Sequence, residues 1–252
     1  MLIIMNVTKS FLLLVLLPTF CLKVLAQRPD QVLQLPEFAG VLRFGICIDT
    51  TSFWLSESEK IDVSGNGDFI KYKISDRRLG HGNIVIEVRK LIDTEGISAC
   101  INSVKLPENS HLMWAYGACS AEENPTIEEN ANNLISERCT DNVFSIEGDA
   151  MTVYYGNSRK LKIVTVIAPD KSNILLCDAN QQNSPLAMYK SGKKTNSPAV
   201  CAICPTSSQS QYFAIYKQNP KADYNKFMFP ELHLNGSFIV HSDSQWMEST
   251  PN

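Results

Sequence analysis

The sequence lacks the features of several protein classes. It carries 23 basic and 26 acidic residues, so there is no excess of positive charge to hold nucleic acid or an anionic membrane surface. The chain is also not poor in apolar residues: 44% of it is hydrophobic and 9% is aromatic. This excludes a chain that is disordered throughout, and the composition is that of a folded globular protein.

The motifs of the common enzyme classes are missing as well. The chain contains no GxSxG elbow, HExxH motif, P-loop or GxGxxG fingerprint. The four histidines stand apart from one another and from the cysteines, although a cluster in space stays open: His81, His111, His233 and His241. We therefore expect a protein without catalytic residues, bound metal or cofactor.

Residues 1–26 have the layout of a secretory signal peptide. Lys9 precedes an apolar run from Phe11 to Leu17, and the small residue Ala26 suits cleavage on its carboxyl side. The run falls short of the roughly 20 residues that span a bilayer, and no later segment is long and apolar enough to do so. We expect a secreted, extracellular protein, with an uncleaved anchor as the alternative.

The cysteines are spread along the chain, as is typical of disulfides in an oxidising compartment. Seven follow the predicted signal peptide: Cys47, Cys100, Cys119, Cys139, Cys177, Cys201 and Cys204. Because seven is odd, at least one thiol is free or pairs between chains. Cys119 and Cys139 flank one insertion, which predicts a disulfide between them. The close pair Cys201 and Cys204 lies between loop-like segments, which favours structural cysteines over a redox or zinc site.

Short β-rich runs bounded by turn residues recur, while helical periodicity is scarce. The runs are 83–92, 111–117, 142–147, 150–155, 160–168, 173–178, 186–190 and 211–217. This pattern predicts an all-β chain with antiparallel strands.

Two stretches interrupt the β-rich pattern. Residues 120–138 hold five glutamates and one basic residue, which predicts a surface insertion that could also contact a protein partner. Residues 191–210 are rich in Ser, Lys, Thr and Pro and are expected to form a loop before the last strand.

Several segments in this order are similar to the lipocalin family, nearest to its apolipoprotein D and insect bilin-binding branch. They are Gly82–Lys90, Cys100–Asn102, Ser145–Ala150, Lys160–Ile163, Ile174–Asp178, Leu186–Tyr189 and Tyr212–Pro220. The chain departs from the family pattern at Ile84, which stands where the family has a tryptophan, and at Lys217, which stands where it has an arginine. The tyrosine that follows the family's T-D pair is absent as well.

The resemblance implies an eight-stranded antiparallel up-and-down barrel over residues 81–220, with an N-terminal extension at 27–80 and a C-terminal segment at 221–252. Such a barrel would carry a small hydrophobic ligand, such as a lipid, a pheromone-like compound or a pigment. The resemblance also implies that Cys47 pairs with Cys201 or Cys204. Cys100 and Cys177 would then pair with the remaining cysteine or stay reduced.

Alternation along 160–168 selects the residues expected to line the cavity. The expected set is Leu161, Ile163, Thr165 and Ile167 together with Met151, Val153 and Tyr155, or else with the neighbours Thr152 and Tyr154.

A second hypothesis is a secreted β-sandwich module that binds another protein and has no ligand cavity. On either hypothesis, the sequon at Asn235 is expected to be accessible and glycosylated.

Overall fold

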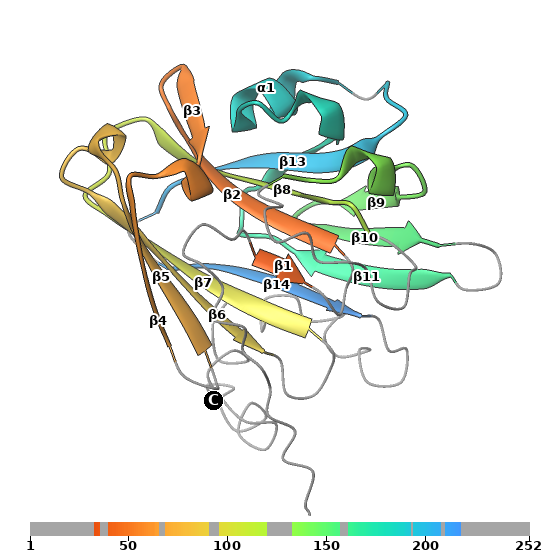
Figure 1. Ribbon diagram of the computed structural model, residues 1–252, viewed down its shortest axis with the longest axis horizontal. Coiled ribbons are helices and arrows are strands. Elements are labelled where there is room, and N and C mark those ends of the chain that lie inside the picture. The colour runs from red at the N-terminus through yellow and green to blue at the C-terminus, as the bar shows by residue number, and fades with distance from the viewer. Residues whose placement is uncertain are drawn as a thin grey trace, which may run out of the picture.

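The computed structural model describes residues 33–35, 40–65, 69–90, 96–119, 133–156, 161–192, 194–207 and 210–217. Strands dominate this part of the chain, and they form two sheets in which every neighbouring pair is antiparallel (Figure 1). The prediction of an all-β, antiparallel chain is confirmed. Among the described helices, none has the length and apolar character needed to cross a membrane.

Sheet A has six strands, in the order β1-β2-β8-β13-β12, and β3 also pairs with β2. Their bounds are Leu33–Leu35 for β1, Gly40–Ile48 for β2, Thr51–Trp54 for β3, Ser110–Gly117 for β8, Asn173–Asp178 for β12 and Pro198–Pro205 for β13. The strands β2 and β8, far apart in the sequence, are therefore direct neighbours.

Sheet B has eight strands, in the order β4-β5-β6-β7-β14-β11-β10-β9. Their bounds are Lys60–Gly65 for β4, Phe69–Ser75 for β5, Asn83–Lys90 for β6, Gly96–Val104 for β7, Val143–Glu147 for β9, Ala150–Tyr155 for β10, Lys162–Ile167 for β11 and Gln211–Lys217 for β14. Two antiparallel meanders thus flank the last strand, β14.

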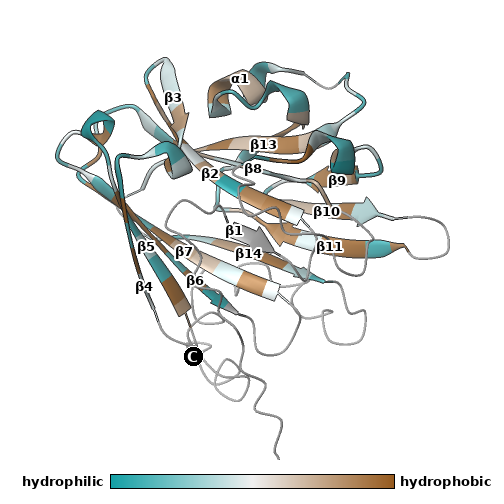
Figure 2. Cartoon of the chain, viewed as in Figure 1, coloured by the Kyte–Doolittle hydropathy of each residue, from teal (hydrophilic) through white to brown (hydrophobic). Residues whose placement is uncertain are grey.

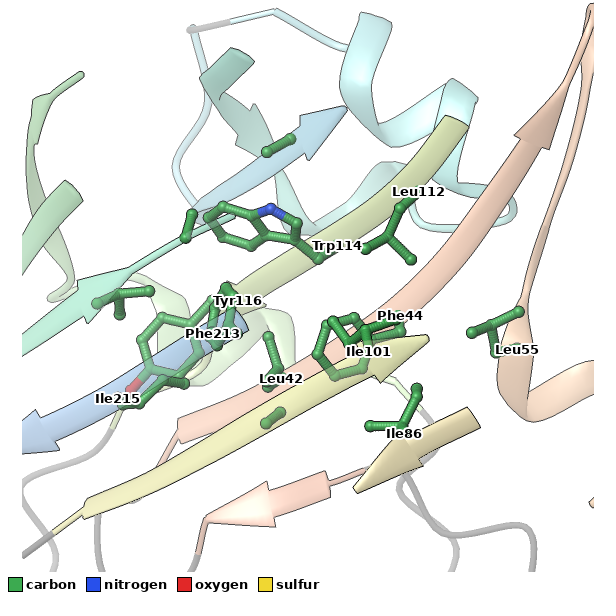
Figure 3. Close-up of a cluster of buried hydrophobic side chains, with 14 of the residues drawn as sticks. Leu42, Phe44, Leu55, Ile86, Ile101, Leu112, Trp114, Tyr116, Phe213 and Ile215 are labelled. Atoms are coloured by element: carbon green, nitrogen blue, oxygen red, sulfur yellow. The ribbon is translucent and has the colours of Figure 1, made fainter. Parts of the chain in front are cut away.

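The space between the sheets holds the main hydrophobic core (Figure 3). Phe213 of β14 makes edge-on contacts with Phe44 of β2 and Trp114 of β8, with ring centroids 5.9 and 5.0 Å apart. Side chains of the two sheets therefore meet directly at the centre. Figure 2 shows hydrophobic residues concentrated along the strands, with hydrophilic residues in the turns and around the short helices.

The expected closed barrel is wrong for the described chain. A barrel requires the two end strands of one sheet to pair with each other. The end strands of sheet B, β4 and β9, do not pair, and the strands instead form a two-layer sandwich. The boundary expected at residue 80 is also corrected, because residues 40–75 supply strands to both sheets and β5 pairs with β6.

Seven of the eight predicted runs correspond to strands, and the run at 186–190 does not. It lies in the helix α1 (Pro185–Lys190), which begins where the Ser184 side chain accepts a hydrogen bond from the Ala187 N–H. Proline at the first position favours a helix start, and this local capping outweighs the β-like composition. The helix packs on the outer face of sheet A, against β12, β13 and β3.

Four short 3₁₀ helices complete the described elements: η1 (Leu55–Glu57), η2 (Arg77–Leu79), η3 (Ser136–Cys139) and η4 (Ala179–Gln181). Asp76 caps η2 with its buried carboxylate, which accepts hydrogen bonds from the Arg78 guanidinium at 2.7 Å. These bonds hold the pKa of the Asp76 carboxyl at about 2. They fix the turn that connects β5 to β6.

Candidate interaction surface

The residues predicted to line a cavity are divided between the two faces of sheet B. Met151, Val153 and Tyr155 of β10 are buried and point into the core between the sheets. In β11 it is Val164 and Val166 that join this core. Because strand residues alternate, Ile163, Thr165 and Ile167 point to the outer face of sheet B, which faces away from sheet A.

The alternative neighbours are the ones that share a face with the selected residues of β11. Tyr154 pairs with Ile163, and Thr152 pairs with Thr165, across the β10–β11 register. Thr165 and Ile167 are buried on this outer face, whereas Leu161, just before β11, is exposed. The structure therefore brings together Thr152, Tyr154, Ile163 and Thr165, away from the core.

A row of apolar side chains crosses the outer face of sheet B at its β9 end. Val143 pairs with Tyr154, and Tyr154 pairs with Ile163. Val143 is 62% exposed and Tyr154 is 36% exposed, and Leu161, two residues before Ile163, is 58% exposed. We refer to these four residues as the outer corner. Single exposed apolar residues are ordinary, but a group on one face marks a candidate interaction site.

The strand β9 beside the outer corner ends sheet B, so one of its edges has no strand partner among the described residues. Four of its five residues are exposed, and Phe144 is partly buried. An open strand edge presents backbone N–H and C=O groups that can pair with another chain. The outer corner thus combines apolar side chains with unused backbone hydrogen-bonding groups.

On the outer face of sheet A, a network of hydrogen bonds is centred on Gln182. The Arg43 guanidinium donates to the Gln182 side-chain oxygen at 2.8 Å, and it lies 3.9 Å from the ring centre of Trp54. The Trp54 indole N–H donates to the Gln182 backbone carbonyl at 2.8 Å. Burial lowers the pKa of Arg43 to about 10. No sequence motif pointed to this network.

Amide side chains hold both ends of the acidic insertion. The Gln182 side chain bonds the backbone N–H and C=O of Leu134, at 2.8 and 2.7 Å. Asn142 does the same for Cys119, at 2.9 and 2.8 Å. Most of the predicted partner-binding stretch 120–138 lies between these two points and outside the described residues.

The comparison with family models finds a match over most of the chain. A model described as a domain of unknown function, DUF4450, matches residues 35–234. The chain belongs to the DUF4450 family. The match includes β2 to β14 and therefore both sheets. A comparison with curated proteins finds no match to the chain.

The seven described cysteines of this DUF4450 chain are thiols, so the expected disulfides are not formed. Cys119 belongs to the core between the sheets, where its thiol donates to the Tyr116 hydroxyl at 3.3 Å. Cys139 belongs to the cluster on the outer face of sheet A and accepts a bond from the Ala118 N–H. The Cys139 sulfur therefore lies against the backbone just before Cys119, while the Cys119 thiol contacts Tyr116 in the core, and the two sulfurs are not bonded to each other.

The expected pairing of Cys47 fails because of the strand order. Cys47 lies in β2, Cys201 and Cys204 lie in β13, and β8 lies between these strands. Two strand spacings of about 4.8 Å exceed the reach of a disulfide. Cys100 and Cys177 lie in different sheets and are also unpaired.

We expect one fast-reacting thiol among these seven. Cys100 is partly exposed and the other six are buried. Burial raises the pKa of Cys119 to about 12 and that of Cys139 to about 11, which leaves little reactive thiolate. A maleimide should modify Cys100 in the native protein and the others after unfolding, as counted by mass spectrometry without reductant. Two or more cysteines that resist labelling after unfolding would indicate a disulfide and contradict this expectation.

The remaining candidate residues lie partly inside and partly outside the described residues. Within them, no group of three or more His, Cys, Asp or Glu side chains is placed to hold a metal ion. The predicted signal peptide, the glycosylation site Asn235, His233 and His241 lie outside the described residues.

Proposed function

We propose that the protein is a secreted, non-catalytic binding module that holds another protein at the outer corner of sheet B. The observation that carries this proposal is the row Val143–Tyr154–Ile163, exposed at Val143 and Tyr154 and partly exposed at Ile163, beside an open strand edge. Apolar side chains would supply desolvation energy on binding, and the strand edge would supply directed hydrogen bonds. Secretion rests on the signal-peptide pattern of residues 1–26.

The interior of the sandwich favours binding at the surface over carriage of a ligand. Phe213 contacts Phe44 and Trp114 across the two sheets, so the centre is occupied by protein side chains. A carrier needs a cavity of several hundred Å³ around its ligand. Direct aromatic contact between the layers is instead typical of a packed sandwich core.

A lipocalin-like carrier of a small hydrophobic molecule is the second candidate, and one observation favours it. The Trp114 indole N–H and the Tyr72 hydroxyl are buried and have no hydrogen-bond partner among the residues that the structure describes. Such groups cost free energy unless they are satisfied, and an apolar ligand with one acceptor atom could satisfy the Trp114 donor. Extraction of the native protein followed by mass spectrometry would detect a co-purifying ligand.

Site-specific photocrosslinking tests the first candidate. A photoreactive phenylalanine derivative replaces Tyr154, and a control carries it at Val63, which is 41% exposed on the opposite edge strand β4. After incubation with the medium of the exporting cells, we expect a discrete adduct from position 154 and none from position 63. Equal adduct patterns at both positions, or a stoichiometric apolar ligand in the extract, would overturn the proposal.

A further inference from the structure

We infer that the partner at the outer corner is a second copy of this chain, joined by antiparallel pairing of β9 with the β9 of that copy. The inference rests on the proposed function, because it names the partner of the same surface. It follows from the chemistry of the two edges of sheet B, from the exposure of β9 and from the spacing of its side chains.

The two end strands of sheet B differ in their protection against pairing. On β4, Lys60 and Asp62 form an exposed ion pair at 3.2 Å, and Gly65 ends the strand. Charged side chains and short or irregular ends are the usual means by which proteins block an edge. In β9, the sequence Val-Phe-Ser-Ile-Glu has one charge, at its last position, and no proline or lysine. The β9 edge is therefore the one suited to pairing.

The inner-face side chains of β9 are only partly covered by the core. Phe144 and Ile146 lie on the inner face, opposite Val153 and Met151 of β10, which are buried. Ile146 is nevertheless 36% exposed, because sheet B ends there. A further strand would cover these two side chains and remove apolar surface from water, at about 25 cal/mol per Å².

The spacing of residues in β9 makes the strand complementary to itself. In a two-fold pair centred on Ser145, Phe144 faces Ile146 of the second copy, and the reverse pair is formed by symmetry. Each pair extends the inner-face core of one sheet into the other. Val143 faces Glu147 of the second copy, so no two like charges are opposed. A partner of different sequence would need the same pattern in reverse.

Matched lysine substitutions on the two edge strands test this inference. Ser145→Lys places two lysines opposite each other at the proposed two-fold axis, whereas Ser64→Lys makes the same change on β4; both serines are exposed. In light scattering after size exclusion, we expect a dimer for the wild type and for S64K, and a monomer for S145K. A monomeric wild type, or a dimeric S145K, overturns the inference.

Disulfide crosslinking between engineered cysteines is an independent test, because it detects the dimer directly and does not depend on a loss of association. Ser145→Cys and Ser64→Cys are compared in a Cys100→Ser background under mild copper-catalysed air oxidation. Directly opposed residues of an antiparallel pair have Cα atoms about 4.5–5.5 Å apart, within the range of a disulfide. We expect a covalent dimer with S145C and a monomer with S64C on non-reducing gels.

Different experimental outcomes would contradict the binding-module proposal and the second-copy inference. A Tyr154 adduct with the mass of another protein, together with a monomeric S145C, overturns the second-copy inference and leaves the binding module intact. Absence of any adduct at position 154 overturns the binding module itself. Circular dichroism of each variant confirms that the sandwich is folded.

Discussion

Val164→Asp is expected to unfold the protein, whereas Ile163→Asp, one residue earlier, should leave it folded. Val164 is completely buried between the sheets, opposite Val153 of β10. An unpaired carboxylate there would lose its hydration, which costs far more than the roughly 4–8 kcal/mol of burying a neutral polar group in an apolar medium. Domains are stable by about 5–15 kcal/mol, so most of the folded population would be lost.

Ile163 is the matched control because it differs by one position and has the same starting chemistry. Its side chain lies on the outer face, partly exposed beside Tyr154, so a carboxylate can stay hydrated. We expect a cost of about 1 kcal/mol, measured by denaturant unfolding followed by tryptophan fluorescence. The opposite order, with I163D unfolded and V164D folded, would show that the register of β11 is shifted by one residue.

The sequence was sufficient to predict seven of the fourteen described strands, but not their arrangement. Alternating apolar residues and turn residues placed β10, β12 and β14 within the bounds observed. Closure into a barrel depends on which distant strands are neighbours, such as β2 with β8 and β7 with β14. No local pattern encodes those pairings, so a barrel and a sandwich look the same along the sequence.

The strand β13 was not predicted, because its sequence also lacks a local pattern that marks it as a strand. It lies between β8 and β12, and its residues Ala199 to Ala202 are all buried. A strand buried on both faces shows no alternation of polar and apolar residues. The serines and lysines that precede it then made the whole segment 191–210 resemble a loop.

The candidate surface was only partly visible in the sequence. Alternation correctly grouped Ile163 with Thr165 but could not say which face of the sheet meets the core. The exposure of Val143 was not predicted from the sequence, because it follows from the position of β9 at the end of sheet B. Gln182 contacts residues 48 and 139 positions away, and a glutamine in a turn carries no signal of such contacts in the sequence.

Gln182→Met is expected to destabilise the protein by about 3 kcal/mol, although methionine nearly matches glutamine in size. The change removes the acceptor of the buried Arg43 guanidinium and both bonds to the Leu134 backbone. A buried charge or backbone group left without its partner costs more than the bond itself contributed. Gln181→Met is the control: Gln181 is the exposed neighbour in η4 and should cost less than 0.5 kcal/mol.

A double-mutant cycle with Arg43→Met separates the two parts of this cost. Methionine at position 43 keeps a flexible apolar side chain against Trp54 and removes the buried charge that Gln182 satisfies. In R43M the loss of Gln182 should therefore cost about 1–2 kcal/mol less than in the wild type, because only the Leu134 bonds remain to be lost. Strict additivity would show that Arg43 draws its stabilisation from elsewhere. The Leu134 bonds alone would then account for the effect of Gln182, by fixing the point where the acidic insertion returns to the sandwich.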